Sequence, residues 1–444
     1  MGLDSIVILI PAALFFILFV RDSPAFSILT VLVAARVFVD GPFNFAVGGL
    51  AASGIVGIAL IGMAVGMLLR GGRGVIFGVL ATAAIFVSNA FAIAAVGESV
   101  SEEAIRLCSV LAVFLIVLNL KVVPSALQVT RSLQFIGAFS AVFSVYQFAA
   151  GDGILVDGDL RVAGFMIHPN SAALLYSICA MVSIGSYYRA GKSRLDLVLF
   201  IVFGVAILAT ASIGGLVALL VMLTSYAFLT PGVSGKIRTG LVFMAALGVA
   251  IFAILPVGAQ RLSELAGLDL TRAGGESNSL EWRIGRWIDI LQFWRDNPFF
   301  GLGYGASTSG RLLRGGYAPH SEYVRVLVET GIVGAVAIVI LIVVALRHLG
   351  RRSKSLDSTS GIASVALASF IGLLINAAAE NTFTYSAPSY VIAILIAFTY
   401  VSMRTGETEA ASVPAAVLAR SRRSGLANER IQKTSSSNRN FRTR

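Results

Sequence analysis

Charged residues, cysteines and histidines are all scarce in this chain of 444 residues. Only 13% of the residues are Asp, Glu, Lys or Arg, whereas soluble domains contain about 25%. The two cysteines, Cys108 and Cys179, lie in apolar runs, which argues against a disulfide framework or a metal site and favours a packing role. No long hydrophilic segment is present that could fold as a separate soluble domain. The chain is 57% hydrophobic, which is typical of a polytopic membrane protein.

Apolar runs of nearly membrane-spanning length recur along the chain, and a spanning helix needs about 20 such residues. The runs lie at 5–20, 25–39, 45–69, 74–96, 104–120, 131–150, 170–188, 195–211, 213–230, 239–256, 323–346, 361–379 and 386–402. We therefore predict an all-α polytopic membrane protein with about 11–13 transmembrane helices. The region 195–230 is one long apolar stretch that we expect to break at 212–215. The run 5–20 lacks a basic flank and a cleavage site, so we expect a retained first helix rather than a signal peptide.

Positive charge is concentrated in the tail 403–444, which holds nine Lys and Arg against three Glu in a chain of net charge +11. This composition predicts a disordered cytoplasmic tail that fixes topology beside anionic lipid, rather than a nucleic-acid partner. Short basic loops lie on the same side of the predicted spans, at 70–73, 121–131, 189–194, 236–238 and 347–354. The loops 151–169, 257–321 and 380–386 then face the periplasm. The side on which the N-terminus lies stays open, because it depends on whether every early run spans.

The loop 257–321 breaks the charge bias, because it carries seven arginines and all three tryptophans on the outer side. Charge gathered just outside a bilayer calls for a functional explanation. The expected organisation has N-terminal transmembrane helices at 1–150, transmembrane helices with the Arg161 loop at 151–256, a large periplasmic loop with an interfacial helix at 257–322, C-terminal transmembrane helices at 323–402 and the tail at 403–444.

The loop 151–169 ends in a polar motif, from Arg161 through Gly164 and His168 to Pro169 and Asn170. We expect Asn170 to cap the next helix. Arg161 and His168 are the only basic residues of this loop. The simplest structural interpretation is that Arg161 pairs with a nearby aspartate, Asp152, Asp157 or Asp159.

Residues 281–294 predict a helix that lies in the outer membrane interface. Its apolar residues recur at helical spacing on one face, namely Ile284, Trp287, Ile288, Leu291 and Trp294. Arg283 projects inside this apolar arc, so it needs an anionic partner to offset its partial desolvation. An arginine that reaches a lipid phosphate is the alternative explanation.

The segment 301–323 combines a glycine-rich turn with His320 at the membrane boundary. The glycines neither follow a strand nor open a helix, so they are no nucleotide fingerprint. A neutral imidazole at this boundary can accept a proton near pH 7, although an interfacial histidine with structural contacts alone is equally consistent. Accessory candidates nearby are Arg286, Arg311, Arg314, Glu322 and Tyr323.

Three loop segments thus bring Arg161, Arg283 and His320 to one membrane face. Guanidinium groups match phosphate oxygens bidentately. Arginines beside a general base could hold a diphosphate leaving group while another hydroxyl takes the transferred group.

These motifs, in their order, resemble the O-antigen ligase and O-antigen polymerase (Wzy-type) superfamily, and within it the exopolysaccharide polymerases most. The resemblance rests on 160–335, with Arg161, Gly164 and 169–170, then Arg283, Trp287 and 297–305, then 320–323 and 329–334. Elsewhere the agreement is in hydropathy and span count alone.

The resemblance implies a GT-C-like, inverting and metal-independent glycosyltransferase of the bacterial inner membrane, without a cofactor. Its donor would be an undecaprenyl-diphosphate-linked glycan and its acceptor a glycan hydroxyl, and partner proteins would serve flipping, chain-length control and export. By the same resemblance, Arg161 and Arg283 bind the diphosphate and His320 is catalytic. Two departures stand out: Ser321 follows the histidine where asparagine is common, and a Ser-Arg pair between central spans is replaced by 210–213.

Three other functions remain open. Asp157 and Asp159 form a D-x-D pair that could bind Mg²⁺ or Mn²⁺, as in an oligosaccharyltransferase-like site. A flippase or transporter would use intramembrane charges, for which Arg36, Arg325 and Glu329 are the candidates, although the last two have i,i+4 spacing and can pair. An O-antigen ligase would share the donor chemistry and differ only in its acceptor, the lipid A core.

Overall fold

The computed structural model describes residues 23–412, except for 42–45, 48–49, 98, 157–158, 190–191, 256–257, 261, 264–278, 313–318 and 356–358. The predicted first helix at 5–20, Arg314, Asp157 and the tail beyond 412 lie outside these residues. The chain divides into two units, Met1–Thr399 and Tyr400–Arg444. All contacts discussed below belong to the first unit.

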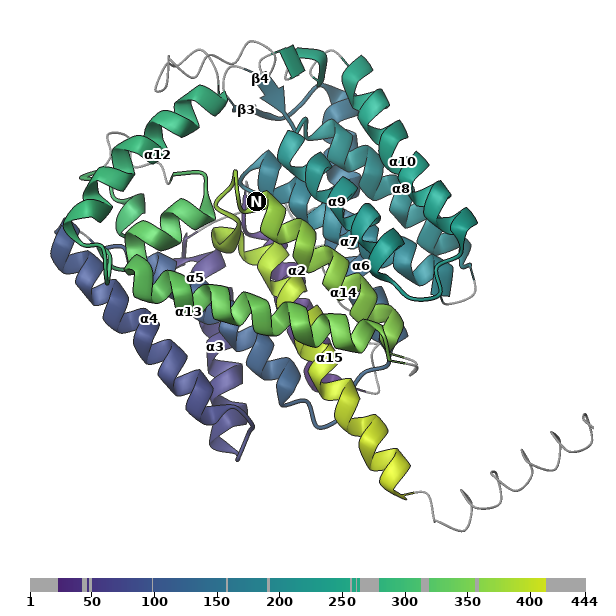
Figure 1. The fold of residues 1–444 in the computed structure, drawn as a ribbon, viewed down its shortest axis with the longest axis horizontal. Coiled ribbons are helices and arrows are strands. Elements are labelled where there is room, and N and C mark those ends of the chain that lie inside the picture. The colour runs from purple at the N-terminus through teal and green to yellow at the C-terminus, as the bar shows by residue number, and fades with distance from the viewer. Residues whose placement is uncertain are drawn as a thin grey trace, which may run out of the picture. The chain divides into compact units, whose positions relative to one another are not determined.

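Apolar helices make up the first unit (Figure 1). They are α2 (Pro24–Phe38), α3 (Ala52–Leu69), α4 (Val75–Val96), α5 (Ser101–Leu118), α6 (Ala126–Ala150), α7 (Pro169–Arg189), α8 (Arg194–Ala209), α9 (Ile213–Leu229), α10 (Gly235–Ile254), α13 (Glu322–Ser353), α14 (Ser360–Asn376) and α15 (Ser386–Ser412), the last of which continues into the second unit. The other elements are α12 (Ser279–Asp296), η2 (Ala306–Thr308), η3 (Thr382–Thr384) and two antiparallel strand pairs, β1 (Ala46–Val47) with β2 (Leu50–Ala51) and β3 (Ile154–Val156) with β4 (Asp159–Arg161).

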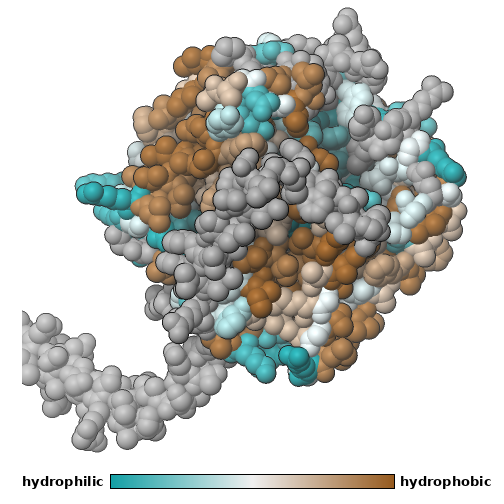
Figure 2. Space-filling view, turned by 180° about the vertical axis from the view of Figure 1, so that it is seen from behind, coloured by the Kyte–Doolittle hydropathy of each residue, from teal (hydrophilic) through white to brown (hydrophobic). Residues whose placement is uncertain are grey.

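The predicted fold class is confirmed: the protein is an all-α polytopic membrane protein. Among the described residues, α3, α4, α6, α7, α10 and α13 are long and apolar enough to cross a membrane, and α2, α9, α14 and 386–402 are shorter apolar helices. Large hydrophobic side chains are exposed on α4, α10 and α13. Figure 2 shows broad hydrophobic areas on the surface, as expected for helices whose solvent is lipid.

Helix α7 lies at the centre of the packing, because every residue from Pro169 to Gly185 is buried. It packs against α6, α8, α9 and α14. A Cβ atom at Gly215 would lie 2.3 Å from the Ala173 Cβ, so the close contact between α7 and α9 needs a glycine there. Cys179 is buried in this core and Cys108 in α5, and neither forms a disulfide.

The break within 195–230 lies at 210–212, slightly before the predicted 212–215. Helix α8 ends at Ala209, Ala211 adopts a left-handed φ of 51°, and the Ser212 hydroxyl caps α9 by accepting from the Gly215 N–H. The cap explains the shift, since Ser212 precedes α9 rather than interrupting it.

Contacts between helix ends define two ends of the bundle. At one end, which we call the basic end, Arg189 at the end of α7 donates to Ser360 at the start of α14, and Arg131 pairs with Asp196. At the opposite end, the start of α13 meets the end of α14 through a Glu322 N–H bond to the Ala377 carbonyl. The loops that carry the predicted site residues lie at this second end.

Candidate functional site

Glu380 is the centre of a buried polar cluster in the connection between α14 and η3. Its carboxylate side chain is only 2% exposed. One carboxylate oxygen lies 3.0 Å from an Arg283 nitrogen and accepts the Asn170 amide at 2.6 Å. The other accepts the Tyr385 hydroxyl at 2.8 Å and lies 3.4 Å from His320 Nδ1. We call these five residues, together with Arg161, the Glu380 cluster.

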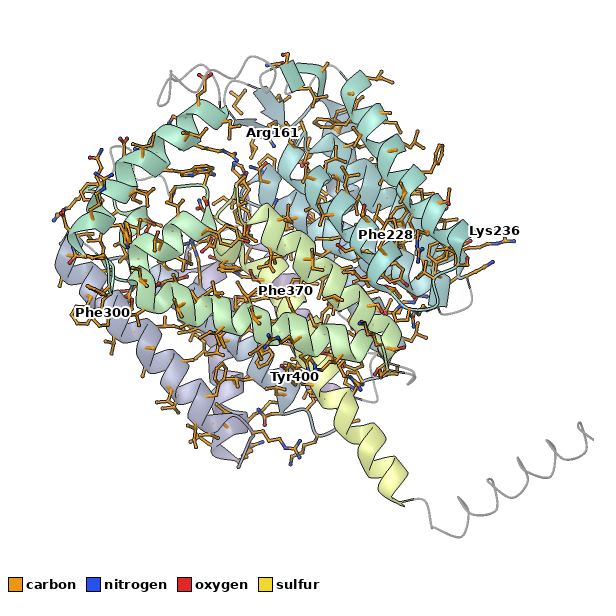
Figure 3. The ribbon with its side chains drawn as sticks, in the orientation of Figure 1. Arg161, Phe228, Lys236, Phe300, Phe370 and Tyr400 are labelled. Carbon is orange, nitrogen blue, oxygen red and sulfur yellow. The ribbon has the colours of Figure 1, made fainter. Side chains whose placement is uncertain are left out.

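Arg161 joins the cluster through Asn170. It ends strand β4, beside the α8–α9 junction (Figure 3). Its Nε donates to the Thr210 carbonyl at 3.0 Å, and a terminal nitrogen donates to the Asn170 side-chain oxygen at 2.9 Å. The α8–α9 junction lacks the Ser-Arg pair of the resembled superfamily. It contacts Arg161 through the Thr210 backbone carbonyl instead.

The prediction that Asn170 caps α7 is wrong, because the helix already begins at Pro169. Proline suits the first helical position, where its missing N–H costs nothing. Asn170 is then free to use its side chain as a bridge between Arg161 and Glu380.

Helix α12 carries Arg283 toward the cluster. The anionic partner that its sequence position calls for is Glu380, and another guanidinium nitrogen donates to the Ala379 carbonyl at 2.5 Å. On the expected apolar face Ile288 is 52% exposed, and outside that face Ile290 is fully buried against Val328 of α13. Periodicity locates an apolar face but does not say which part of it meets lipid and which meets protein.

His320 is held from several sides. Its backbone adopts φ 50°, a left-handed conformation that is uncommon for a residue with a side chain and that clusters at functional sites. The Trp287 indole N–H donates to the Pro319 carbonyl at 2.6 Å, and the Trp282 ring lies edge-on to the imidazole at 5.5 Å. The following Ser321 hydroxyl caps α13. The imidazole therefore has a fixed position at the helix start.

Charge in the cluster favours an ionised Glu380. Burial opposes ionisation, but Arg283, followed by the hydrogen bond with His320, holds the pKa of the carboxyl well below its usual range. Burial, followed by the adjacent Glu380, raises the pKa of Tyr385 well above its usual value, so this hydroxyl stays a donor. A carboxylate that faces Nδ1 favours the neutral tautomer with its proton on Nδ1, which leaves Nε2 as an acceptor.

A family model described as O-antigen ligase matches residues 198–339. This stretch, about a third of the chain, is similar to the O-antigen ligase family. The predicted relationship to the ligase and polymerase superfamily is thus confirmed, and it indicates a membrane glycosyltransferase of the ligase or polymerase type. No curated protein matches the chain. The O-antigen ligase match covers Thr210, Arg283 and His320, while Arg161, Asn170 and Glu380 lie outside it.

The accessory candidates have separate positions. Arg286 lies over the Trp282 ring at 5.3 Å, next to the cluster. Arg311 donates to the Val96 carbonyl at the end of α4, and Tyr323 donates to the Leu374 carbonyl of α14. The buried Glu322 carboxylate accepts the Phe383 N–H at 3.2 Å, so it fixes the start of α13 against the segment that follows Glu380.

The alternative metal pair is not described: Asp157 lies outside the described residues, as does the side chain of Asp159. Within the described part of the chain, no group of three or more His, Cys, Asp or Glu side chains is placed to hold a metal ion. The i,i+4 pair of Arg325 and Glu329 does form, at 3.1 Å.

Sequence reasoning missed Glu380 and Tyr385 as site residues. One signal was available, because Glu380 is the only charged residue between 358 and 403. An isolated acid between two apolar helices, on the same side as the arginine-bearing loops, is a candidate partner for those arginines.

Proposed function

We propose that this protein transfers a glycan from undecaprenyl diphosphate to a hydroxyl group of a second glycan, and so polymerises the repeat units of a surface polysaccharide or exopolysaccharide. The reaction would take place at the periplasmic face of the bacterial inner membrane. The observation that carries the proposal is that Arg283, His320 and Arg161 meet at Glu380 and Asn170. The O-antigen ligase domain supports the choice of a lipid-linked glycan as donor.

Arg283 has an unused donor that fits a diphosphate. Its Nε is buried and has no hydrogen-bond partner among the described residues, while its terminal nitrogens are held by Glu380 and Ala379. A buried N–H without a partner is costly unless a ligand supplies one. A phosphate oxygen of the bound donor would satisfy it, and Arg161 would share the negative charge.

His320 acts as the general base in this mechanism. With its proton on Nδ1 toward Glu380, its Nε2 takes the proton of the acceptor hydroxyl as the hydroxyl oxygen attacks the anomeric carbon. The bond from that carbon to the diphosphate oxygen breaks, and its electron pair leaves with the diphosphate. Attack opposite the leaving group inverts the anomeric centre. Arg161 and Arg283 stabilise the departing charge, for which one fixed donor is worth about 3–4 kcal/mol.

The periplasmic location rests on charge asymmetry. The cluster lies at the end of the bundle opposite Arg131 and Arg189, and short loops rich in Lys and Arg favour the cytoplasm. The tail 403–444 would lie on the cytoplasmic side with them, and the loop 257–322 on the periplasmic side.

Analysis of lipid-linked glycans in a deletion strain tests the proposal. A lost polymerase leaves single repeat units on the lipid at the periplasmic face, which gels and mass spectrometry detect as one short species. Full-length chains that stay on undecaprenyl diphosphate would instead identify a ligase. Repeat units confined to the cytoplasmic leaflet would identify a flippase and contradict the proposal.

A further inference from the structure

His168 lies at the start of α7 and has no role in the mechanism above. It is half-buried, and its Nδ1 accepts the backbone N–H of Asn170 at 3.2 Å. A neutral imidazole carries one proton, so an accepting Nδ1 places that proton on Nε2. The local backbone thereby fixes the tautomer, and Nε2–H is a donor.

The surroundings of His168 are those of the Glu380 cluster. The titratable and charged groups that act on its imidazole are Glu380, Arg161, His320 and Arg283. Burial first, opposed by Glu380 and reinforced by the cations, lowers the pKa of His168 to about 4, so the ring is neutral at physiological pH. Within the described part of the chain, Nε2–H has no hydrogen-bond partner.

We propose that His168 is a further binding residue of this site, donating a hydrogen bond from Nε2–H to an oxygen of the diphosphate. The inference rests on the proposed function and deepens it. A fixed donor that cannot accept matches a diphosphate oxygen, which accepts and cannot donate. Two arginines act on the same ring, and Asn170, which fixes the tautomer, also holds Arg161. No proton moves in this contact.

Neutrality is part of the proposed role. A charged imidazole would be repelled by Arg161 and Arg283 and would compete with Arg283 for Glu380. A neutral donor adds a directed contact to the leaving group without disturbing the ion pair between Arg283 and Glu380.

Two isosteric substitutions test the two ring nitrogens of His168 separately. In His168→Gln the amide N–H reaches the position of Nε2, whereas in His168→Asn the amide oxygen replaces Nδ1 as the acceptor for Asn170. We would purify each variant in detergent, together with His168→Ala, and measure the binding of inorganic pyrophosphate by calorimetry. Donor KM would be measured separately, with lipid-linked repeat units from the deletion strain as substrate.

We expect His168→Gln to bind pyrophosphate within about threefold of the wild type, and His168→Asn and His168→Ala to bind about tenfold more weakly, since a charge-assisted hydrogen bond is lost. The donor KM should follow the same order with little change in kcat. The matched control is His348→Gln, because His348 contacts Thr399 in another part of the unit. Thermal melting of each variant shows whether it is folded. If His168→Ala does not fold, the comparison of His168→Gln with His168→Asn decides the test.

If His168→Asn keeps the wild-type affinity for pyrophosphate and His168→Gln loses it, His168 only makes a structural contact at the start of α7. That result would overturn the inference. Wild-type affinity for pyrophosphate in His168→Ala would overturn it too, as would a wild-type protein that does not bind pyrophosphate. A wild-type protein that binds pyrophosphate in a His168-dependent way, yet forms no glycosidic bond with the lipid-linked donor, would contradict the proposed function and leave this contact standing.

Discussion

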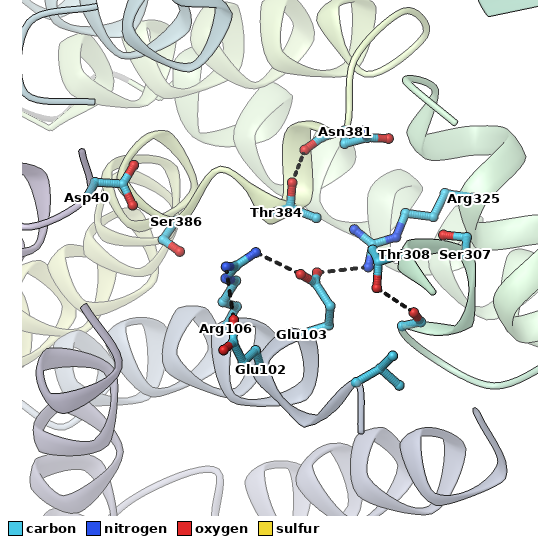
Figure 4. Close-up of polar contacts among 12 residues, drawn as sticks. Asp40, Glu102, Glu103, Arg106, Ser307, Thr308, Arg325, Asn381, Thr384 and Ser386 are labelled. Atoms are coloured by element: carbon cyan, nitrogen blue, oxygen red, sulfur yellow. Dashed lines mark hydrogen bonds and ion pairs between the residues drawn. The ribbon is translucent and has the colours of Figure 1, made fainter. Parts of the chain in front are cut away.

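The protein has two buried polar clusters with opposite arrangements of charge. In the Glu380 cluster a single carboxylate faces an arginine, a histidine, an amide and a hydroxyl. In the second, which we call the Arg325 cluster, a single guanidinium faces Glu103 at 3.0 Å, Glu329 at 3.1 Å and Glu322 at 3.9 Å. Figure 4 shows Glu103 between Arg106 and Arg325.

Exposure distinguishes the two clusters. Arg325 is 0% exposed and Glu322 and Glu329 are each 1% exposed, whereas Arg283 is 17% and His320 22% exposed. The Arg325 cluster is therefore closed to a ligand, and its partners come from α5, α13 and, through Ser307, from η2. In the Glu380 cluster the carboxylate and Arg161 are buried, whereas Arg283 and His320 are partly exposed. The difference teaches that the Arg325 cluster holds helices together, whereas the Glu380 cluster presents charge.

Glu322 connects the clusters. It lies beside Arg325, and its carboxylate accepts the N–H of Phe383, three residues after Glu380. His320 is two residues before it. The Arg325 cluster thus helps to set the distance between His320 and Glu380, and substitutions in the two clusters should separate activity from stability.

The largest effect is expected for Glu380→Gln. An amide facing Nδ1 can donate a hydrogen bond, which moves the His320 proton to Nε2 and removes the base. By analogy with carboxylate-to-amide changes in catalytic triads, the transfer rate should fall on the order of 10³–10⁴-fold. Rates in membranes of a deletion strain measure it. The control is Glu102→Gln, whose carboxylate is 85% exposed, and equal rates for both variants would remove Glu380 from the mechanism.

Arg325→Ala should act on stability instead. It removes the cation that faces the buried Glu322 and Glu329 and leaves Glu103 with Arg106 alone, and breaking a buried pair costs about 3–5 kcal/mol. We expect low yield and a clearly lower Tm in detergent. Arg106→Ala removes a partly exposed partner of the same Glu103 and should cost about 1 kcal/mol or less. A wild-type Tm for Arg325→Ala would contradict the division between the clusters.

Arg283→Ala should have the opposite profile from Arg325→Ala. The transfer rate should fall about 10²–10³-fold, the loss typical of one donor to developing charge, while the protein remains in the membrane at a normal level. Polymer length on gels and the rate in membranes give the result. Arg238→Ala, on α10, is the matched arginine control. A large drop in Tm with an unchanged rate per folded molecule would make Arg283 structural.

The smallest effect is a dependence of stability on pH. The pKa of Glu380 is lowered in the folded protein, so its contribution to stability is complete above the ordinary glutamate pKa of about 4.3 and is lost as pH falls through the lower folded value. The Tm difference between wild type and Glu380→Gln should therefore be constant near neutral pH and shrink below about pH 4. A difference that shrinks well above that pH would contradict an ionised Glu380.

The sequence predicted the fold class well and the cluster only in part. Apolar runs and loop charge brought Arg161, Arg283 and His320 to one end, because those signals are local. Glu380 was missed since its contacts join residues 60, 97 and 210 positions away in sequence, and no periodicity reports such distances. The same limit explains Ile288 and Ile290 on α12, where a helical pattern cannot distinguish a lipid neighbour from a protein one.

The hydrogen bond from the Trp287 indole to the Pro319 carbonyl has a mechanical consequence. Trp287 lies one turn beyond Arg283 on α12, and Pro319 immediately precedes His320. A tilt of this amphipathic helix would displace guanidinium and imidazole in concert, so their separation is preserved while their height above the lipid changes. The thickness and headgroup composition of the surrounding bilayer would then tune the rate of the proposed glycan transfer without altering the spacing between Arg283 and His320.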